Sequence, residues 1–344
     1  MKQPHTVILT ALAIENAAVV AALGGCTAYP WNGTTLHTTN VSGHAVLVAP
    51  ASGVGPERAA QATQRAIDVW GPARLLLVGI AAGIPEGADD LRLGDVLVPN
   101  QVVGYDPAKL KPTAVERRWE VFRPDRLLLD RATGVRADEW VHTIGVPRPD
   151  GSDGRVIPRV HVGPVLSGSK VVADTDAVAR LRASWPKMIS IEMESIGVAL
   201  TAYRNGAGFL VVKAASDFAD SGKADDWHPY AAAAAARFAA AVLRQSPAAD
   251  DRPASIVPAR VGTSFPSAAK LHFCRHLGPS WKELTVLLAV PAYQEAQFAH
   301  GDEAREVWHW LESRDKLHAL PGALRNIGRL DLADALARDD RDAP

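Results

Sequence analysis

The stretch from 188 to 220 constrains the fold more strongly than any other part of the chain. An apolar lead-in meets two closely spaced acids, Glu192 and Glu194, and a run of small residues with helical character follows them. A continuous apolar run at 209–212 comes next, and Asp217 lies shortly after it. Open α/β sheets present their chemistry at the ends of their strands. The pattern therefore predicts an α/β fold whose helix and strand each bring a carboxylate to one site.

The chain has enough apolar residues for a large core. At 344 residues it is long for one domain, so we expect two. Hydrophobic residues make up 47% of it, and a formal net charge of -1 argues against attraction to nucleic acid. The two cysteines, Cys26 and Cys274, form neither a metal-ligand spacing nor a disulfide framework. We therefore expect a protein of the reducing cytoplasm, with no metal and no cofactor.

The apolar run at 7–14 has to be distinguished from a signal peptide. Glu15 ends the run and no small-residue cleavage site follows, so the run predicts a buried first strand. No apolar run approaches the roughly 20 residues that a membrane-spanning helix needs. We therefore expect no association with a membrane.

The first eighty residues show strands and helices in alternation. The expected elements are a strand at 6–12, a helix at 15–23, a hairpin at 34–38 and 45–48, a helix at 57–70 and a buried strand at 74–79. A glycine turn at 52–55 opens the second helix. Such a turn leaves backbone N–H groups free to meet an anion or a ribose oxygen, although an ordinary strand-to-helix turn has the same pattern.

The segment at 188–220 resembles the closing signature of the nucleoside phosphorylase and methylthioadenosine/adenosylhomocysteine nucleosidase superfamily. In that family an E-M-E segment and an S-D segment line one nucleoside pocket. A small-residue turn and the strand after it match as well, through Gly79, Ala81, Gly83, Gly94 and Asp95, as does the strand and loop at 161–174. The resemblance implies a mixed sheet flanked by helices over residues 1–245. It also implies a substrate site formed by Gly79, Ala81, Val172, Glu192, Met193, Glu194 and Ser216, to which we add Lys170, where the small nucleosidases usually have an uncharged residue.

The resemblance assigns roles to three acids. Asp217 matches the general acid that protonates N7 of the leaving purine, and Glu194 matches the carboxylate that binds the ribose hydroxyls, with Met193 beside the sugar. Glu15 matches the glutamate that deprotonates the attacking water. Each acid also has a plainer interpretation. Glu15 and Glu192 could be helix N-terminal carboxylates, and Asp217 could cap a loop.

The turn after the buried strand separates two reaction types. Phosphorylases of the family carry a phosphate-binding serine there, whereas Ile80 and Ala82 offer no side-chain donor. The resemblance therefore implies hydrolysis of a purine N-glycosidic bond. Some members stack an aromatic side chain on the base near Val171, where this chain has aliphatic residues. That difference concerns base stacking and not the fold.

Two features bear on the 5′ end of the substrate. Residues 104–159 are irregular, rich in Pro, Arg and Asp, and could hold one helix at 123–132. They are interpreted either as a solvated flap or as a lid over the nucleoside. Lys170 follows a Ser-Gly-Ser turn, and it either points to solvent or neutralises phosphates of a substrate such as ATP.

A proline-rich linker at 246–266 precedes a tail without apolar strands. Six helical patterns are expected, at 268–277, 280–289, 292–300, 302–313, 316–327 and 329–338. Over 267–340 their order resembles the death-fold superfamily, which implies a six-helix interaction domain; a helical cap on the enzyme is the alternative. Trp308 and Trp310 point apart on a regular helix, so we expect one to be exposed. His272 and His276 lack a third ligand and are expected at the surface.

Together these features predict an N-glycosidase, a hydrolase of purine nucleosides or nucleotides. We expect it to act as a regulated effector in bacterial immunity or antiphage defence, recruited through its death-like domain by a like domain of a partner or of itself. A homo-oligomer, most simply a dimer, is expected. A housekeeping methylthioadenosine/adenosylhomocysteine nucleosidase and a non-catalytic nucleoside sensor are the alternatives.

Overall fold

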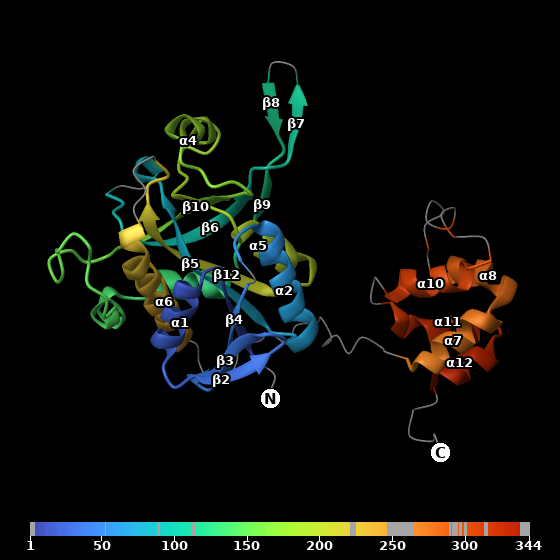
Figure 1. Cartoon of the computed structure of the whole chain (residues 1–344). Coiled ribbons are helices and arrows are strands. Elements are labelled where there is room, and N and C mark those ends of the chain that lie inside the picture. Colours follow the sequence, from blue (N-terminus) through green and yellow to red (C-terminus); the bar gives the residue numbers. More distant parts are fainter. Residues whose placement is uncertain are drawn as a thin grey trace. The chain divides into compact units, whose positions relative to one another are not determined.

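The chain forms two compact units, residues 1–251 and 252–344 (Figure 1). The computed structural model describes the whole chain except residues 1–3, 52, 88–89, 112–113, 221–224, 246–264, 289, 291–294, 296–297, 299–300, 313–315 and 338–344. The predicted linker at 246–266 therefore lies almost entirely outside the described residues.

A mixed sheet forms the centre of the first unit. Ten strands join it within the described residues, in the order β11-β10-β6-β12-β5-β1-β4-β3-β2, with β9 paired to β6. Their bounds are β1 Thr6–Thr10, β2 Thr27–Trp31, β3 Thr34–Val41, β4 His44–Pro50, β5 Arg74–Gly83, β6 Val96–Gly104, β9 Glu120–Phe122, β10 Val160–Ser167, β11 Ser190–Glu192 and β12 Gly208–Asp217. The mixed sheet expected from the sequence is confirmed.

The continuous apolar runs become the central strands. β1, β5 and β12 are parallel neighbours, and nearly all their residues are buried because helices cover both faces of the sheet. Alternate side chains enter different clusters. Ile8 and Leu76 face α1 Ala13–Leu23 and α6 His228–Arg244, whereas Leu75 and Val211 face α2 Pro56–Trp70 and α5 Ser195–Arg204. The remaining α-helices of this unit are α3 Arg126–Gly134 and α4 Thr175–Arg182.

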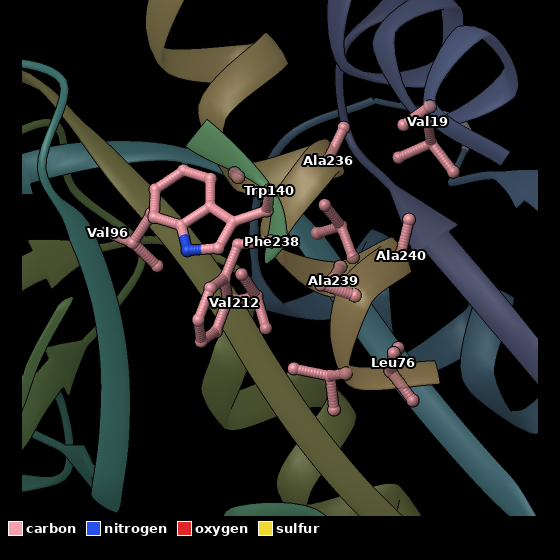
Figure 2. Packing of buried hydrophobic residues seen from close by; sticks show 14 of the residues in the cluster. Val19, Leu76, Val96, Trp140, Val212, Ala236, Phe238, Ala239 and Ala240 are labelled. Atoms are coloured by element: carbon pink, nitrogen blue, oxygen red, sulfur yellow. The ribbon is translucent and has the colours of Figure 1, made fainter. Parts of the chain in front are cut away.

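Alanine-rich α6 packs closely against the sheet and α1. Its alanines at 231–236 and 239–241 are buried, and small side chains let neighbouring backbones approach. Figure 2 shows Ala236, Ala239 and Ala240 within the same cluster as Val212 of β12. The dense alanines of α6 thus serve close packing of the helix against the sheet and α1.

Residues 104–159 are more regular than the sequence suggested. They contain a separate hairpin of β7 Ala108–Lys111 and β8 Ala114–Arg117, then β9, α3 and two short 3-10 helices, η2 Ala137–Glu139 and η3 Val141–Thr143. The expected solvated flap is wrong for the part around Trp140. This side chain is 1% exposed and packs on Phe238 of α6, with ring centroids 5.4 Å apart (Figure 2). Burial of a large aromatic surface holds this part of the segment on the domain.

The second unit is helical. Its described helices are α7 Ser267–His276, α8 Trp281–Leu287, α10 Glu303–Glu312, α11 Leu320–Asn326 and α12 Leu330–Ala337, and the expected helix at 292–300 lies mostly outside the described residues. The expectation of one exposed tryptophan is wrong, because Trp308 and Trp310 are 1% and 5% exposed. α10 contacts both α7 and α8, so Trp308 and Trp310 are both buried although they point in different directions from this helix.

No helix among the described residues combines the length and the apolar character that crossing a membrane would require.

Candidate active site

A cavity of about 190 Å³ lies at the ends of β1, β5, β11 and β12. All the predicted site residues except Gly79 line it, so residues from distant parts of the chain meet in one place. Among the described residues, none of those that line it comes from 104–159, which does not support a lid over this cavity within one chain.

Glu15 lies in the first turn of α1 and is 2% exposed. Its Oε2 accepts hydrogen bonds from the backbone N–H groups of Ala11 and Leu12, both at 2.8 Å. Its Oε1 accepts one from the N–H of Ile80, also at 2.8 Å. Glu15 is thus the helix N-terminal carboxylate of the plainer interpretation, and it also bridges to β5 at the cavity wall. Gly79 permits this bridge, since a Cβ atom there would overlap the Glu15 carboxylate.

Glu194 is held by two donors from other elements. Gly55 N–H donates to Oε1 at 3.1 Å, and the Lys213 ammonium donates to Oε2 at 3.1 Å. The glycine turn, for which the sequence left open a role in binding an anion or a ribose oxygen, thus binds a carboxylate of the protein itself. Burial opposes ionisation of Glu194, but Lys213 and the Gly55 N–H outweigh it and lower its pKa. Glu194 is therefore held as a carboxylate.

The Glu192 carboxylate binds neighbouring groups of the protein, so its oxygens are not free to face the cavity. It accepts hydrogen bonds from the backbone N–H groups of Glu194 and Ser195, at the start of α5. Its Oε2 lies 3.7 Å from the Lys213 Nζ atom. Burial raises the pKa of Glu192. This position at a helix N-terminus fits the plainer interpretation of Glu192, although the residue also lines the cavity.

Lys213 was not identified from the sequence. Its side chain is 1% exposed, inside β12. Burial favours the neutral amine, but attraction to Glu194, Glu15 and Glu192 outweighs it and raises the pKa of Lys213. The only signal in the sequence is that one charged residue interrupts an apolar strand. Such a residue is unusual because burying an unpaired charge is costly.

Asp217 ends β12 directly after an irregularity in the pairing of β12 with β5. The Ser216 hydroxyl donates to Oδ2 at 3.1 Å, and the Ala219 N–H donates to Oδ1 at 3.0 Å. Ala219 has a φ of 57°, a left-handed conformation that a residue with a Cβ atom rarely adopts. Asp217 is therefore oriented by its own loop, half-buried at the cavity.

Aliphatic side chains occupy the rim of the cavity. Val54 and Val171 line it and are 47% and 66% exposed, so they offer apolar surface to a planar base without an aromatic ring. Lys170 also lines the cavity, but its side chain is 76% exposed and its Nζ atom lies 4.0 Å from Asp106. His228, the first residue of α6, also lines the cavity, and the sequence did not indicate it.

A second cavity, of about 960 Å³, is larger than the first. It lies against Tyr230 and the segment from Arg136 to Ile157. Size alone would favour it as a binding site, but the carboxylate cluster lies in the smaller cavity, so we place the chemistry there. Within the described residues, no cluster of three or more His, Cys, Asp or Glu side chains could hold a metal ion.

Two family models match the chain. Residues 6–245 match the phosphorylase superfamily, and residues 267–339 match bacterial death-like domain 3. The second match agrees with the resemblance of the tail to the death fold.

Curated relatives of two kinds resemble the chain in sequence. ATP nucleosidase Cap17 of Escherichia coli (strain KTE188) is 29% identical over 265 residues, covering 70% of this chain and 51% of the relative. The death domain-containing ATP nucleosidase of Amphimedon queenslandica is 25% identical over 222 residues, covering 60% and 41%. A 5′-methylthioadenosine/S-adenosylhomocysteine nucleosidase of Maridesulfovibrio salexigens is 24% identical, covering 53% and 72%. The chain spans about half the length of the two ATP nucleosidases.

Solved structures share the fold of the first unit. The 5′-methylthioadenosine/S-adenosylhomocysteine nucleosidase of Neisseria meningitidis has a TM-score of 0.55 at 22% identity, covering 70% of this chain and 98% of that one. Futalosine hydrolase of Helicobacter pylori has a TM-score of 0.55 at 19% identity, covering 70% and 97%. At these identities the likeness concerns the fold.

Proposed function

Because this chain belongs to the phosphorylase superfamily, we propose that its first unit hydrolyses the N-glycosidic bond of a purine nucleoside or nucleotide. The observation that carries the proposal is the meeting of Glu15, Glu194 and Asp217 around one cavity. These acids come from α1, the start of α5 and the end of β12, so it is the fold that brings them together.

The geometry supports a division of labour among the three acids. Asp217, held by Ser216 and the Ala219 N–H, faces the cavity and would protonate the departing base. Glu194, kept ionised by Lys213, would stabilise the positive charge that develops on the sugar. Glu15, fixed by three backbone N–H groups, would orient and deprotonate the attacking water. The turn at 79–83 has no hydroxyl side chain for phosphate, which favours water as the nucleophile.

We propose an adenine nucleotide, with ATP first among the candidates, as the substrate. Support comes from the curated relatives named as ATP nucleosidases. Lys170 gives the proposal only weak support, because its ammonium is largely exposed and already has Asp106 nearby. Methylthioadenosine or adenosylhomocysteine is the second candidate, since relatives with that nucleosidase activity in their names match the chain as well.

We further propose that the enzyme is an effector of bacterial antiphage defence. Its death-like domain at 267–339 would bind the death-like domain of a partner protein or of a second copy of this chain. Homodimer formation and a cytoplasmic location stay predictions.

Base release from a panel of substrates tests the proposal. The purified protein is incubated with ATP, NAD, adenosine and methylthioadenosine, each with and without inorganic phosphate, and the products are separated by chromatography. We expect free adenine and a ribose product without added phosphate. Strict dependence on phosphate with formation of ribose 1-phosphate would show that the enzyme is a phosphorylase, and binding without release would favour the nucleoside sensor.

A further inference from the structure

Arg148 is a buried cation outside the cavity that contains the three acids. Its side chain is 3% exposed, and its guanidinium carbon lies 5.0 Å and 5.1 Å from the ring centroids of Trp227 and Tyr230. Hydrogen bonds to Asp150 and Ser152 satisfy much of the rest of the guanidinium. A cation that contacts two aromatic rings and is shielded from water is held more strongly than an exposed one.

The same side chains contact the turn that precedes β6. The Arg148 Nη2 atom lies 3.4 Å from the Leu93 carbonyl oxygen. The Tyr230 ring lies against Gly94, where a Cβ atom would collide with it and where φ is +86°. Arg148 and Tyr230 therefore fix the position of this turn.

The turn at 93–95 is hydrogen-bonded to β12, the strand that carries Asp217. Gly94 N–H donates to the Ala215 carbonyl at 2.8 Å, and Ala215 N–H donates to the Asp95 carbonyl at 2.9 Å. Ala215 lies two residues before Asp217, just where the pairing of β12 with β5 becomes irregular. A strand end with an irregular ladder depends on such contacts for its position.

A second connection runs through the start of α6. The rings of Trp227 and Tyr230 both contact Arg148, and these residues lie one position before and two positions after His228, which lines the cavity of the three acids. His228 therefore lies between two residues that the buried arginine contacts, and Asp217 is connected to the arginine through the turn at 93–95 and Ala215.

We propose that Arg148, Trp227 and Tyr230 form a clasp that positions Asp217 and His228 from behind the cavity. Arg148 is then a positioning residue for the proposed hydrolysis, and the inference rests on that proposed function. The clasp also lines the larger cavity, because Arg148 and Tyr230 are both part of its wall. General acid catalysis is sensitive to small displacements, and an error of about 1 Å can cost about a hundredfold in rate.

Two substitutions of Arg148 test the clasp. Arg148→Met removes the charge and the hydrogen bonds, and Arg148→Lys keeps a charge next to the two rings but loses the planar guanidinium. We expect Arg148→Met to lower kcat by at least about tenfold while KM stays within about twofold, because orientation of the acid is lost and not the binding surface. Arg148→Lys should recover part of the loss, and it serves as the milder variant if the methionine protein does not fold.

Trp140→Leu is the matched control. Trp140 belongs to the same segment and packs on α6 through Phe238, so its loss disturbs the packing of the segment but none of the contacts at 93–95. We expect its kcat to stay close to that of the wild type even where its melting temperature falls as far as that of Arg148→Met.

Amide hydrogen exchange gives a readout that does not depend on turnover. In the Arg148 variants the N–H groups of Ala215 and Ala219 should exchange faster, while in Trp140→Leu they should not. Unchanged kcat and unchanged exchange in both Arg148 variants would overturn the clasp, as would an equal loss of kcat in Trp140→Leu. If the wild-type protein released no base at all, the proposed function would fail, and the exchange data would still decide the structural part of the inference.

Discussion

At the scale of single residues, the site depends on one lysine among three carboxylates. Lys213 contacts Glu194 directly and lies near Glu192, and the charge of Glu15 acts on it as well. Burying these groups costs hydration energy that only close pairing and hydrogen bonds offset. Each glutamate therefore also receives backbone N–H donors. A carboxylate kept ionised in this way can stabilise positive charge on a sugar at once, without reorganisation.

Replacing Lys213 should test this arrangement through stability. Lys213→Met leaves three buried carboxylates without their cation, and we expect the free energy of unfolding to fall by about 3–5 kcal/mol. Lys213→Arg keeps the charge and should lose much less. Urea denaturation at neutral pH measures both variants. A methionine variant as stable as the wild type would show that the carboxylates do not depend on the lysine.

Asp217→Asn should separate chemistry from folding. The amide keeps an oxygen to accept the Ala219 N–H but cannot transfer a proton to the base. We expect base release to fall by about 10²–10⁴-fold, with little change in melting temperature. Asp226→Asn, an exposed neighbour in the sequence, is the control. A retained rate in Asp217→Asn would mean that another group protonates the base.

The sequence predicted these acids more readily than their partners. Glu15, Glu194 and Asp217 follow recognisable motifs at element boundaries. The partners that fix them come from distant parts of the chain, and Lys213 and Arg148 are recognisable only once their burial is known. A contact that depends on tertiary packing leaves no local pattern. The local signal at Lys213, one charge within an apolar run, gave no indication of its partners.

At the scale of elements, buried runs were predictable and exposed strands were not. β5 and β12 follow from continuous apolar sequence. β2 was missed because it is an exposed edge strand that contains Pro30, and proline is tolerated only where no ladder hydrogen bond is needed. The β7–β8 hairpin pairs only with itself, so no core-facing alternation reveals it. Trp308 and Trp310 were misjudged because α10 has neighbours on more than one side.

The crossing of α2 and α5 determines the position of Glu194, which makes Gly197 a test at this scale. A Cβ atom at Gly197 would overlap the Pro56 carbonyl oxygen, next to the Gly55 N–H that binds Glu194. Gly197→Ala should therefore push the helices apart, cost about 1–3 kcal/mol of stability and lower kcat. Gly134→Ala, at the end of α3, meets only ordinary contacts and is the control. Equal behaviour of the two variants in denaturation and turnover would contradict the idea.

At the scale of the whole molecule, each unit has a core of its own. The sheet and its helices enclose separate clusters from those of the tail, where Phe273, Trp308 and Leu324 lie in one cluster. Unit 1 and unit 2 therefore each contain what an independent domain needs. The family matches divide the chain in the same way. Catalysis and recruitment can then be assigned to different parts of the chain and measured apart.

The last prediction is that the death-like domain recruits the enzyme and adds nothing to its site. A protein that lacks residues 261–344 should fold and release base at the rate of the full chain, since the described residues that line the cavity of the three acids all belong to the first unit. The tail has charged residues of both signs, including Lys270, Arg305 and Glu306 around a groove of about 390 Å³. Mixed charges favour docking whose specificity depends on charge placement, so association of the isolated tail should weaken between about 0.05 and 0.5 M salt. Pull-down of the tail with a second death-like domain, or with itself, measures this directly. A truncated enzyme that is folded but inactive, or an association insensitive to salt, would show that the tail has another role.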